Sequence, residues 1–202
     1  MRAAGRVGEV LCVLLCVPFW APVVAVGALL VLVLDGRPAF FRARRMGVGG
    51  RPFTLWKLRT MAPGIWPRVS GPGEASVTVL GRYLRRTRLD ELPQLVNVLR
   101  GDMALVGPRP EDPDFVDSAD PRWVQVLARR PGLCSPVTLR FTAIEGRLLA
   151  GSADPEAVYR RRILPRKLAL EAAYARERTP WSDFVCLARC AAYPVVGSAT
   201  RR

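Results

Sequence analysis

The sequence predicts a mainly α-helical protein with one small β-hairpin, held on a membrane by a re-entrant N-terminal helix. Three observations predict this class. Residues 10–34 are uncharged, residues 47–50 form a glycine-rich turn between two strand-like segments, and proline-marked helix starts follow at Asp154-Pro155 and Thr179-Pro180. We expect a membrane helix over residues 1–36 and a cytoplasmic domain over residues 37–202, with some helices lying on the membrane surface.

The N-terminal apolar segment is long enough to reach across a bilayer. Its 25 residues, at ~1.5 Å per residue, exceed a ~30 Å hydrocarbon core, so a spanning helix is the simplest interpretation. However, Pro18 and Pro22 favour a break near its middle, and basic residues flank both ends, which places both ends in the cytoplasm. A helix that enters, breaks and returns satisfies both observations. A cleaved signal peptide fits less well because the segment is longer than a typical h-region.

The charge balance favours an anionic partner. The chain has 31 Lys and Arg against 17 Asp and Glu, a net charge of +14, and no histidine. Histidine therefore takes no part in catalysis or in metal binding. Phosphates, lipid headgroups and nucleic acid are all compatible with the positive charge. The five cysteines lack a C-x-x-C spacing, so we expect reduced thiols rather than a disulfide framework or a zinc site.

The predicted hairpin, within residues 38–61, carries basic residues on its second strand. Phe53, Leu55, Lys57 and Arg59 alternate onto one face. Lys57 and Arg59 are therefore expected to reach a common anion, or else to form a solvated strand end that touches lipid headgroups.

The densest chemistry lies in residues 80–110. Winding residues 89–100 as one helix places Asp90, Gln94 and Asn97 on one face and four apolar residues opposite. We expect the apolar face to pack and the polar face to be free for substrate.

Asp90 and Glu91 are adjacent carboxylates near a helix start. With Thr87 as N-cap and Pro93 in the first turn, the helix dipole is expected to keep Asp90 ionised. Such a pair suits a Mg²⁺ site and an aspartyl nucleophile for phosphoryl transfer. The alternative is that both residues merely decorate the helix N-terminus.

The turn Pro108-Arg109-Pro110 presents one guanidinium between two fixed φ angles. This arrangement suits a diphosphate or a uridine-bearing ligand, although a simple linker has the same composition. Residues 62–76 predict a mobile loop beside the site, and the acidic residues from Glu111 to Asp120 are expected to cap the following helix and pair with arginines.

Two sequence blocks carry a family resemblance. LRRTRLDELPQLVNVLRGDMALVGPRP, and more weakly FRARRMGVGGRPFTLWKLRTM, resemble the bacterial sugar transferases that act as monotopic polyprenyl-phosphate phosphoglycosyl transferases. The resemblance implies that Asp90 and Glu91 are the catalytic dyad and Mg²⁺ ligands. It adds Lys57, Arg59 and Arg109 to Gln94 and Asn97 as substrate-binding residues, and it places the break of the membrane helix at Ala21-Pro22.

The implied reaction transfers a sugar-1-phosphate from a UDP-sugar to polyprenyl phosphate, through a phospho-sugar on Asp90, and so initiates exopolysaccharide or glycan assembly. The expected partners are the nucleotide-sugar, the polyprenyl phosphate and membrane lipids, with no nucleic acid, at the cytoplasmic face of the bacterial inner membrane. The sequence leaves the sugar, the lipid length and the oligomeric state open.

Four positions depart from the family pattern, namely Ala21, Ala43, Arg88 and Cys134. They keep open a catalytically silent homologue that serves as an assembly partner. A second alternative is a membrane-anchored basic protein that binds nucleic acid or anionic lipid, although few aromatic residues stand between the basic ones.

Overall fold

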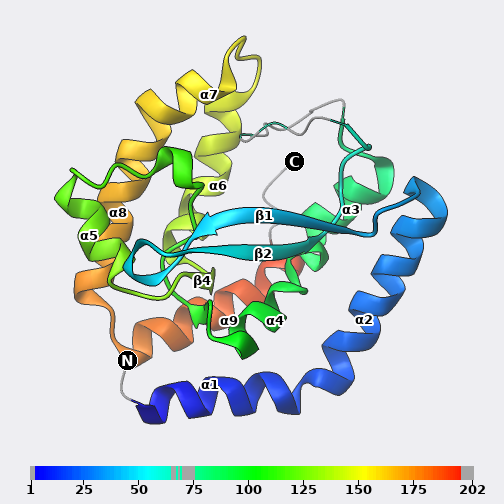
Figure 1. Ribbon diagram of the computed structural model, residues 1–202, viewed down its shortest axis with the longest axis horizontal. Coiled ribbons are helices and arrows are strands. Elements are labelled where there is room, and N and C mark those ends of the chain that lie inside the picture. The colour runs from blue at the N-terminus through cyan, green and yellow to red at the C-terminus, as the bar shows by residue number, and fades with distance from the viewer. Residues whose placement is uncertain (1–2, 65–66, 68, 70–75, 197–202) are drawn as a thin grey trace.

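Helices surround a two-stranded hairpin in the computed structural model, which describes residues 3–64, 67, 69 and 76–196 (Figure 1). The predicted class, mainly α with a small β-hairpin, is confirmed for these residues. The longer helices are α1 (Ala3–Leu15), α2 (Val17–Leu30), α3 (Val79–Thr87), α4 (Gln94–Arg100), α5 (Pro121–Leu127), α6 (Pro136–Leu149), α7 (Pro155–Val158), α8 (Leu164–Glu177) and α9 (Pro180–Val196). Shorter helical turns are η1 (Val31–Asp35), η2 (Val48–Gly50), η3 (Leu89–Glu91), η4 (Pro113–Phe115) and η5 (Tyr159–Ile163).

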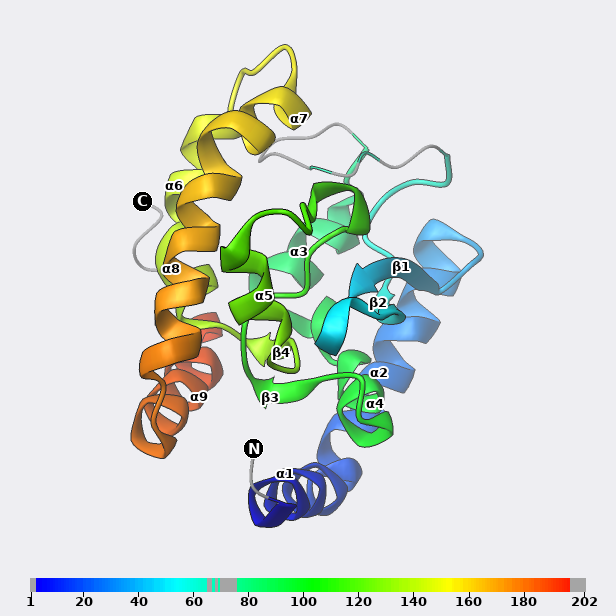
Figure 2. The same cartoon turned by 60° about the vertical axis from the view of Figure 1, so that its left-hand side comes forward.

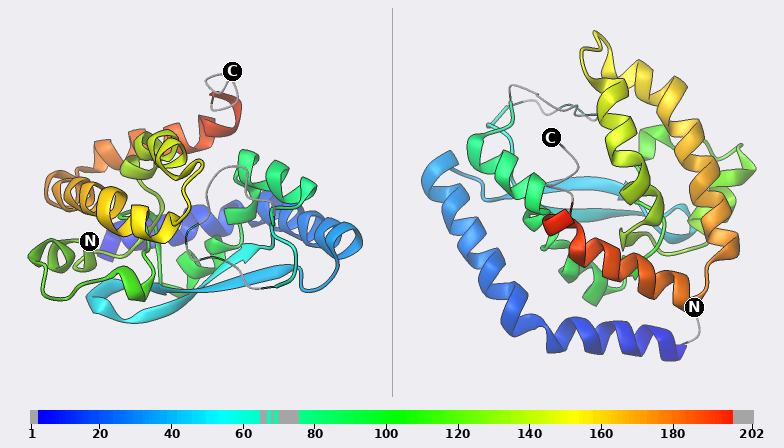
Figure 3. Two further views of the ribbon diagram at one scale, coloured as in Figure 1. Left: turned by 90° about the horizontal axis from the view of Figure 1, so that it is seen from above. Right: turned by 180° about the vertical axis from the view of Figure 1, so that it is seen from behind.

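The hairpin forms as the alternating sequence predicts. Strand β1 (Phe40–Met46) pairs antiparallel with β2 (Pro52–Leu58), with Ala43 opposite Leu55, and the glycine-rich turn lies between them. Leu55 and Leu58 are buried, and the hairpin runs along one edge of the molecule with most of the helices on one side of it (Figure 3, left).

A second, parallel sheet was not predicted. Strands β3 (Ala104–Val106) and β4 (Gly132–Cys134) have three residues each, too few to show alternation in the sequence. Their backbones meet at Gly107 and Gly132, where a Cβ on Gly132 would lie 2.1 Å from the Gly107 nitrogen. This close approach requires glycine, and it fixes where the chain enters the Pro108-Arg109-Pro110 turn.

The N-terminal apolar segment is bent beside Pro18, one of the two expected helix breakers, and not at Pro22. Helices α1 and α2 meet at Cys16 (Figure 1), whereas Pro22 lies inside α2. Pro18 occupies the first turn of α2, where its missing N–H costs little. At the bend, the Trp20 indole Nε1 donates to the Val13 carbonyl at 3.2 Å, which satisfies a backbone group that lipid cannot. The predicted break at Ala21-Pro22 is therefore wrong by more than one turn.

Helix α1 is attached to the rest of the protein by polar contacts. The Arg6 guanidinium donates to the carbonyls of Val98 and Met103, and a Glu9 carboxylate oxygen accepts from the Leu105 N–H at 3.2 Å. Exposed apolar side chains lie along α1, α2 and η1, namely Leu11, Leu15, Phe19, Val26, Leu29 and Val33.

The helix over Val17–Asp35 has the length and composition of a membrane span. Whether it crosses or re-enters remains a prediction, as does the division at residues 36 and 37.

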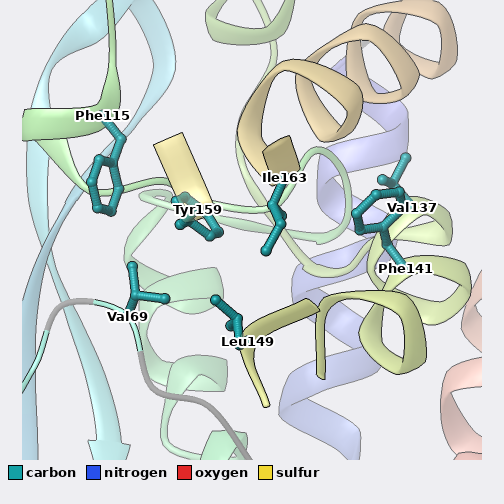
Figure 4. Close-up of a cluster of buried hydrophobic side chains, with 7 residues drawn as sticks. All are labelled: Val69, Phe115, Val137, Phe141, Leu149, Tyr159 and Ile163. Atoms are coloured by element: carbon teal, nitrogen blue, oxygen red, sulfur yellow. The ribbon is translucent and has the colours of Figure 1, made fainter. Parts of the chain in front are cut away.

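The C-terminal helices build a separate apolar cluster. Phe115, Phe141, Tyr159 and Ile163 meet between α6, α7 and η5 (Figure 4). Helices α6 and α8 pack against each other (Figure 2). Asp154 caps α7 as predicted, accepting from the Ala157 N–H at 2.9 Å. Helix α7 continues through η5 into α8 without a break, so Pro165 lies within a continuous helical run. Of the predicted mobile loop, residues 65–66, 68 and 70–75 lie outside the described residues.

The polar face of α4 is buried, contrary to the expectation that it stays free. Asn97 is 0 % exposed; its amide nitrogen donates to the Thr54 carbonyl at 2.8 Å and to Asp102 at 3.1 Å, and its oxygen accepts from the Trp56 N–H at 3.2 Å. These contacts join α4 to β2, so Asn97 holds the fold together instead of reaching a substrate. The helix expected over residues 89–100 is also divided, because Pro93 separates η3 from α4.

We predict that Asn97→Ala lowers the free energy of unfolding by about 2–4 kcal/mol, because three buried hydrogen bonds lose a partner. In thermal unfolding in detergent the midpoint should fall by roughly 5–15 °C. Arg100→Ala, at an exposed position of the same helix, is the matched control. An Asn97→Ala midpoint equal to that of the control would contradict the structural role.

Candidate functional site

The chain reverses direction at Arg88, immediately before the two carboxylates. Thr87 was expected to be an N-cap, but it ends α3, where its hydroxyl donates to the Tyr83 carbonyl at 2.9 Å. Arg88 then adopts φ 57° and ψ 17°, a left-handed backbone conformation that residues other than glycine rarely adopt. The turn η3 follows and directs Asp90 inward, leaving it 6 % exposed.

Glu91 is held by three basic side chains. Its Oε1 atom lies 2.9 Å from Lys57 Nζ and 3.2 Å from Arg109 Nη2, and its Oε2 atom lies 3.9 Å from Arg88 Nη1. We call Lys57, Arg88 and Arg109 the basic cage. Burial raises the pKa of the Glu91 carboxyl, but the cage outweighs it and holds that pKa well below its usual range. Glu91 is therefore ionised at neutral pH.

Asp90 has the opposite electrostatics. Burial raises the pKa of its carboxyl to about 6; Glu91 adds to the rise, while Lys57, Arg85 and Arg109 oppose it. We expected the helix dipole to keep Asp90 ionised; η3 is a single turn, however, and burial has a larger effect on the pKa than the dipole. At neutral pH the carboxylate is still the main form.

Two adjacent carboxylates thus differ sharply in proton affinity, and this asymmetry assigns them different chemistry. Glu91 fixes Lys57 and Arg109 in place, where they can also bind phosphate oxygens. Asp90, poorly solvated and ionised near neutral pH, has the properties of a nucleophile.

Arg59 lies just past the strand that carries Lys57. Strand β2 ends at Leu58, and Arg59 is 1 % exposed, with its Nη2 atom donating to the carbonyls of Asp35 at 2.7 Å and Gly36 at 2.5 Å. Through Nη2, Arg59 joins the end of the apolar helix to the hairpin. Its buried Nε and Nη1 atoms have no hydrogen-bond partner within the described residues, and the expectation that Lys57 and Arg59 reach a common anion stays a prediction.

Of the remaining predicted site residues, one is buried in the fold and one belongs to the basic cage. Gln94 is 3 % exposed on α4, next to the buried Asn97, whereas Arg109 lies in the cage with its side chain 33 % exposed. Arg85, which the sequence did not single out, is oriented by its Nε atom donating to the Thr60 hydroxyl at 2.8 Å.

The acidic residues after Arg109 act as caps, as predicted. Asp112 accepts from the Asp114 N–H at the start of η4 and pairs with Arg45 at 2.7 Å. Asp120 caps α5 and pairs with Arg122 at 2.6 Å. Cys134 is buried in β4 and packs with Val106 and Cys186.

Over the described part of the chain, no three acidic or cysteine side chains converge as a metal site. The carboxylate oxygens that could hold a metal here are those of Asp90 and the Oε2 atom of Glu91, next to the basic cage. Because Mg²⁺ is commonly held by one or two carboxylates together with substrate phosphates, these residues fit a metal shared with substrate, not a site made by protein alone.

The site lies against the apolar helix. Leu89, next to Asp90, packs with Val31, Leu58 and Leu84. A buried acidic pair inside a basic cage, beside a helix of membrane-like composition, defines a class of enzyme that handles phosphorylated substrates at a lipid surface.

The comparison with known proteins identifies the family. Residues 1–196 match the family model described as bacterial sugar transferase, and the chain belongs to that family. The family is membrane-associated. Membership of this family makes the chain a phosphoglycosyl transferase.

Curated relatives agree with this assignment. Over 91 % of the chain and 67 % of its own length, a Caulobacter vibrioides UDP-glucose:undecaprenyl-phosphate glucose-1-phosphate transferase is 36 % identical. An Aeromonas hydrophila UDP-N-acetylgalactosamine-undecaprenyl-phosphate N-acetylgalactosaminephosphotransferase is 35 % identical over 62 % of the chain and 31 % of its own length. The exopolysaccharide production protein ExoY of Rhizobium meliloti is 34 % identical over 64 % of the chain and 66 % of its own length. The chain thus spans about two thirds or less of these relatives.

We predict that Asp90→Asn stabilises the fold at neutral pH. The folded-state pKa of about 6 exceeds the ordinary 3.8, so the buried carboxylate costs stability above pH 6, and this cost disappears below about pH 4, where the group is protonated in both states. The gain, on the order of 3 kcal/mol, should be full at pH 8 and should vanish toward pH 4.

Thermal unfolding between pH 4 and 8 measures this effect, with the exposed Glu177→Gln as control. A less stable Asp90→Asn protein at pH 8 would show that the cage more than compensates for burial.

Proposed function

We propose that this protein transfers a sugar-1-phosphate from a UDP-sugar to polyprenyl phosphate, through a covalent phospho-sugar on Asp90. The observation that carries the proposal is the asymmetric dyad: one carboxylate is held as an anion by the basic cage, and its neighbour is buried and poised near neutral pH. The named reactions of the Caulobacter and Aeromonas relatives support the donor and acceptor classes.

In the first half-reaction, an Asp90 carboxylate oxygen attacks the β-phosphorus of the donor. A new P–O bond forms to Asp90, the bond from this phosphorus to the bridging oxygen breaks, and UMP leaves with that oxygen. Lys57 and Arg109, fixed by Glu91, stabilise charge that accumulates on the phosphoryl oxygens.

In the second half-reaction, a phosphate oxygen of the polyprenyl acceptor attacks the same phosphorus. The bond to Asp90 breaks, the carboxylate is restored and polyprenyl-diphospho-sugar is released. The contact between Leu89 and the apolar helix supports an approach of the acceptor from the membrane side, where a lipid-borne phosphate lies.

Mg²⁺ is part of the proposal. Asp90 and Glu91 Oε2 would hold it together with donor phosphates, and it would neutralise diphosphate charge. The cage residues bind and orient the same phosphates from the protein side.

The positions that depart from the family pattern leave this arrangement intact, which favours an active enzyme over a silent partner. Ala43 is buried opposite Leu55, Cys134 packs in a core cluster, and Arg88 contributes to the cage. We place the protein at the cytoplasmic face of the inner membrane, because α1 and α2 expose apolar side chains and the donor is a water-soluble nucleotide.

The covalent step predicts a mass adduct. Purified protein incubated with Mg²⁺ and a panel of UDP-sugars, without acceptor, should gain the mass of one sugar-phosphate and release one UMP, and peptide mapping should place the adduct on Asp90. Asp90→Asn should show neither, whereas Glu177→Gln should show both. UMP release that requires polyprenyl phosphate, with no adduct at any time, would contradict the two-step reaction.

Membrane attachment is predicted to depend on the bend between α1 and α2. Leu15 and Phe19 are 75 % and 76 % exposed, so Leu15→Asp with Phe19→Asp should release the protein from vesicles, at a cost of roughly 2.5–3.5 kcal/mol for each charge. Val124→Asp, which introduces a charge at a 65 % exposed site on α5, should remain bound in the same flotation assay. Equal flotation of the two variants would contradict insertion of the bend.

A further inference from the structure

Two buried charged residues lie one turn apart on α8, and one of them contacts the backbone of Arg109. Lys167 and Glu171 are spaced four residues apart and are 6 % and 5 % exposed, and they share their helix face with the packed Leu168 and Ala172. Burying charge among apolar side chains is costly unless each group is well paired. The contacts of these two residues therefore indicate which structural role offsets the free-energy cost of burying them.

Glu171 joins three segments through one oxygen. Its Oε1 atom accepts from the Ser135 hydroxyl at 2.7 Å and from the Arg109 backbone N–H at 3.3 Å. Ser135 is itself the N-cap of α6 and accepts from the N–H groups of Val137 and Thr138. Helix α8, the start of α6 and the Arg109 turn are thus fixed relative to one another.

The Arg109 N–H is a special donor because of its neighbours. Pro108 and Pro110 carry no N–H, so Arg109 supplies the sole backbone donor of the Pro-Arg-Pro turn. The two prolines fix their own φ angles, which leaves the backbone of Arg109 as the main freedom of the turn. A hydrogen bond to this N–H restricts that freedom, and with it the direction in which the guanidinium leaves the backbone.

Lys167, the other buried charge, lies 3.4 Å from Glu145 Oε2 and also reaches Glu111, the residue after the Pro-Arg-Pro turn. Lys167 Nζ donates to the Tyr159 hydroxyl at 3.0 Å, and that hydroxyl donates to Glu111 Oε2 at 2.5 Å. The turn is therefore tied to α8 at Arg109 and, through Tyr159 in η5, at Glu111. From this position the Arg109 Nη2 atom lies 3.2 Å from Glu91 Oε1.

We propose that Glu171 is a positioning residue for the transfer reaction: by holding the Arg109 N–H, it aims the Arg109 guanidinium at Glu91 and at the donor phosphates. The functional part rests on the proposed function, whereas the backbone contact stands without it. Arginine must be aimed accurately here because its fork-shaped guanidinium binds phosphate in a fixed geometry.

The second oxygen of Glu171 is consistent with this role. Glu171 Oε2 is buried and has no hydrogen-bond partner within the described residues. Burial raises the pKa of this carboxyl to about 7, against the opposing effects of Ser135, Arg109 and Lys167. A proton on Oε2 leaves Oε1 free to accept both hydrogen bonds, so the contact to Arg109 survives in either protonation state.

Hydrogen exchange tests the contact directly, without any assay of activity. Because its flanking prolines have no amide hydrogen, Arg109 contributes the one exchanging amide between residues 108 and 110. In the full-length protein in detergent, Glu171→Met should speed exchange of this amide by at least ~10-fold, which corresponds to the loss of one hydrogen bond. Glu171→Gln, which keeps an acceptor oxygen, should exchange like the wild type. Unchanged exchange in Glu171→Met would overturn the proposal.

A double-mutant cycle tests the consequence for catalysis. Glu171→Met should lower kcat/KM for the UDP-sugar about 10–100-fold in the wild-type background but less than ~2-fold in an Arg109→Ala background, since a residue that acts through Arg109 has nothing left to position. Glu171→Gln should restore most of the loss. Equal losses in both backgrounds would overturn the positioning role. A wild-type protein that releases no UMP would instead refute the proposed function, and the exchange experiment would still decide the contact.

Discussion

The ion pairing of Glu91 is the interaction on which the site depends. Its carboxylate brings together a lysine from β2, an arginine that follows β3 and an arginine from the reversal after α3. These segments are far apart in the sequence, and without a buried anion the three cations would repel one another. The same grouping explains why Asp90 can be buried and still ionise near neutral pH, since Lys57 and Arg109 offset part of the desolvation.

Positioning of this cluster falls to elements that carry no catalytic group. The close approach of Gly107 and Gly132 sets the start of the Arg109 turn, α8 fixes its backbone, and Asn97 attaches α4 to the strand that carries Lys57. The left-handed Arg88 then turns Asp90 inward. The site is thus assembled from several rigid contacts, each made by a residue whose side chain is buried or whose backbone is constrained.

Local patterns predicted the local structure well. The hairpin follows from alternation around a glycine-rich turn, and the cap at Asp154 follows from its proline and acidic neighbours. The family signature pointed to Asp90, Glu91, Lys57 and Arg109, which the structure brings together, although their catalytic roles remain proposals. Three-residue strands leave no pattern, so the β3–β4 sheet was missed. The predicted position of the bend, at Ala21-Pro22, was wrong because Pro22 is tolerated inside α2. The observed bend lies at Cys16, where the Trp20 indole donates to the Val13 carbonyl.

Burial was the property that sequence alone judged least well. Arg59 and Asn97 were expected at the surface because they are polar, yet backbone carbonyls and amides inside the protein accept and supply their hydrogen bonds. Glu171 was missed for the related reason that a Lys and a Glu four residues apart usually mark a solvated helix face. Only the tertiary structure shows that this face is covered.

The polar attachment of α1 has a consequence for the surrounding lipid. Arg6 and Glu9 bind backbone groups around α4 and β3, so the depth of this helix is set by the protein and cannot adjust freely to bilayers of different thickness. In the proposed membrane-bound protein, the leaflet would therefore deform around the helix, by thinning or thickening at its edge. Acyl-chain length in the host membrane would then act on β3 through the Glu9 contact to Leu105.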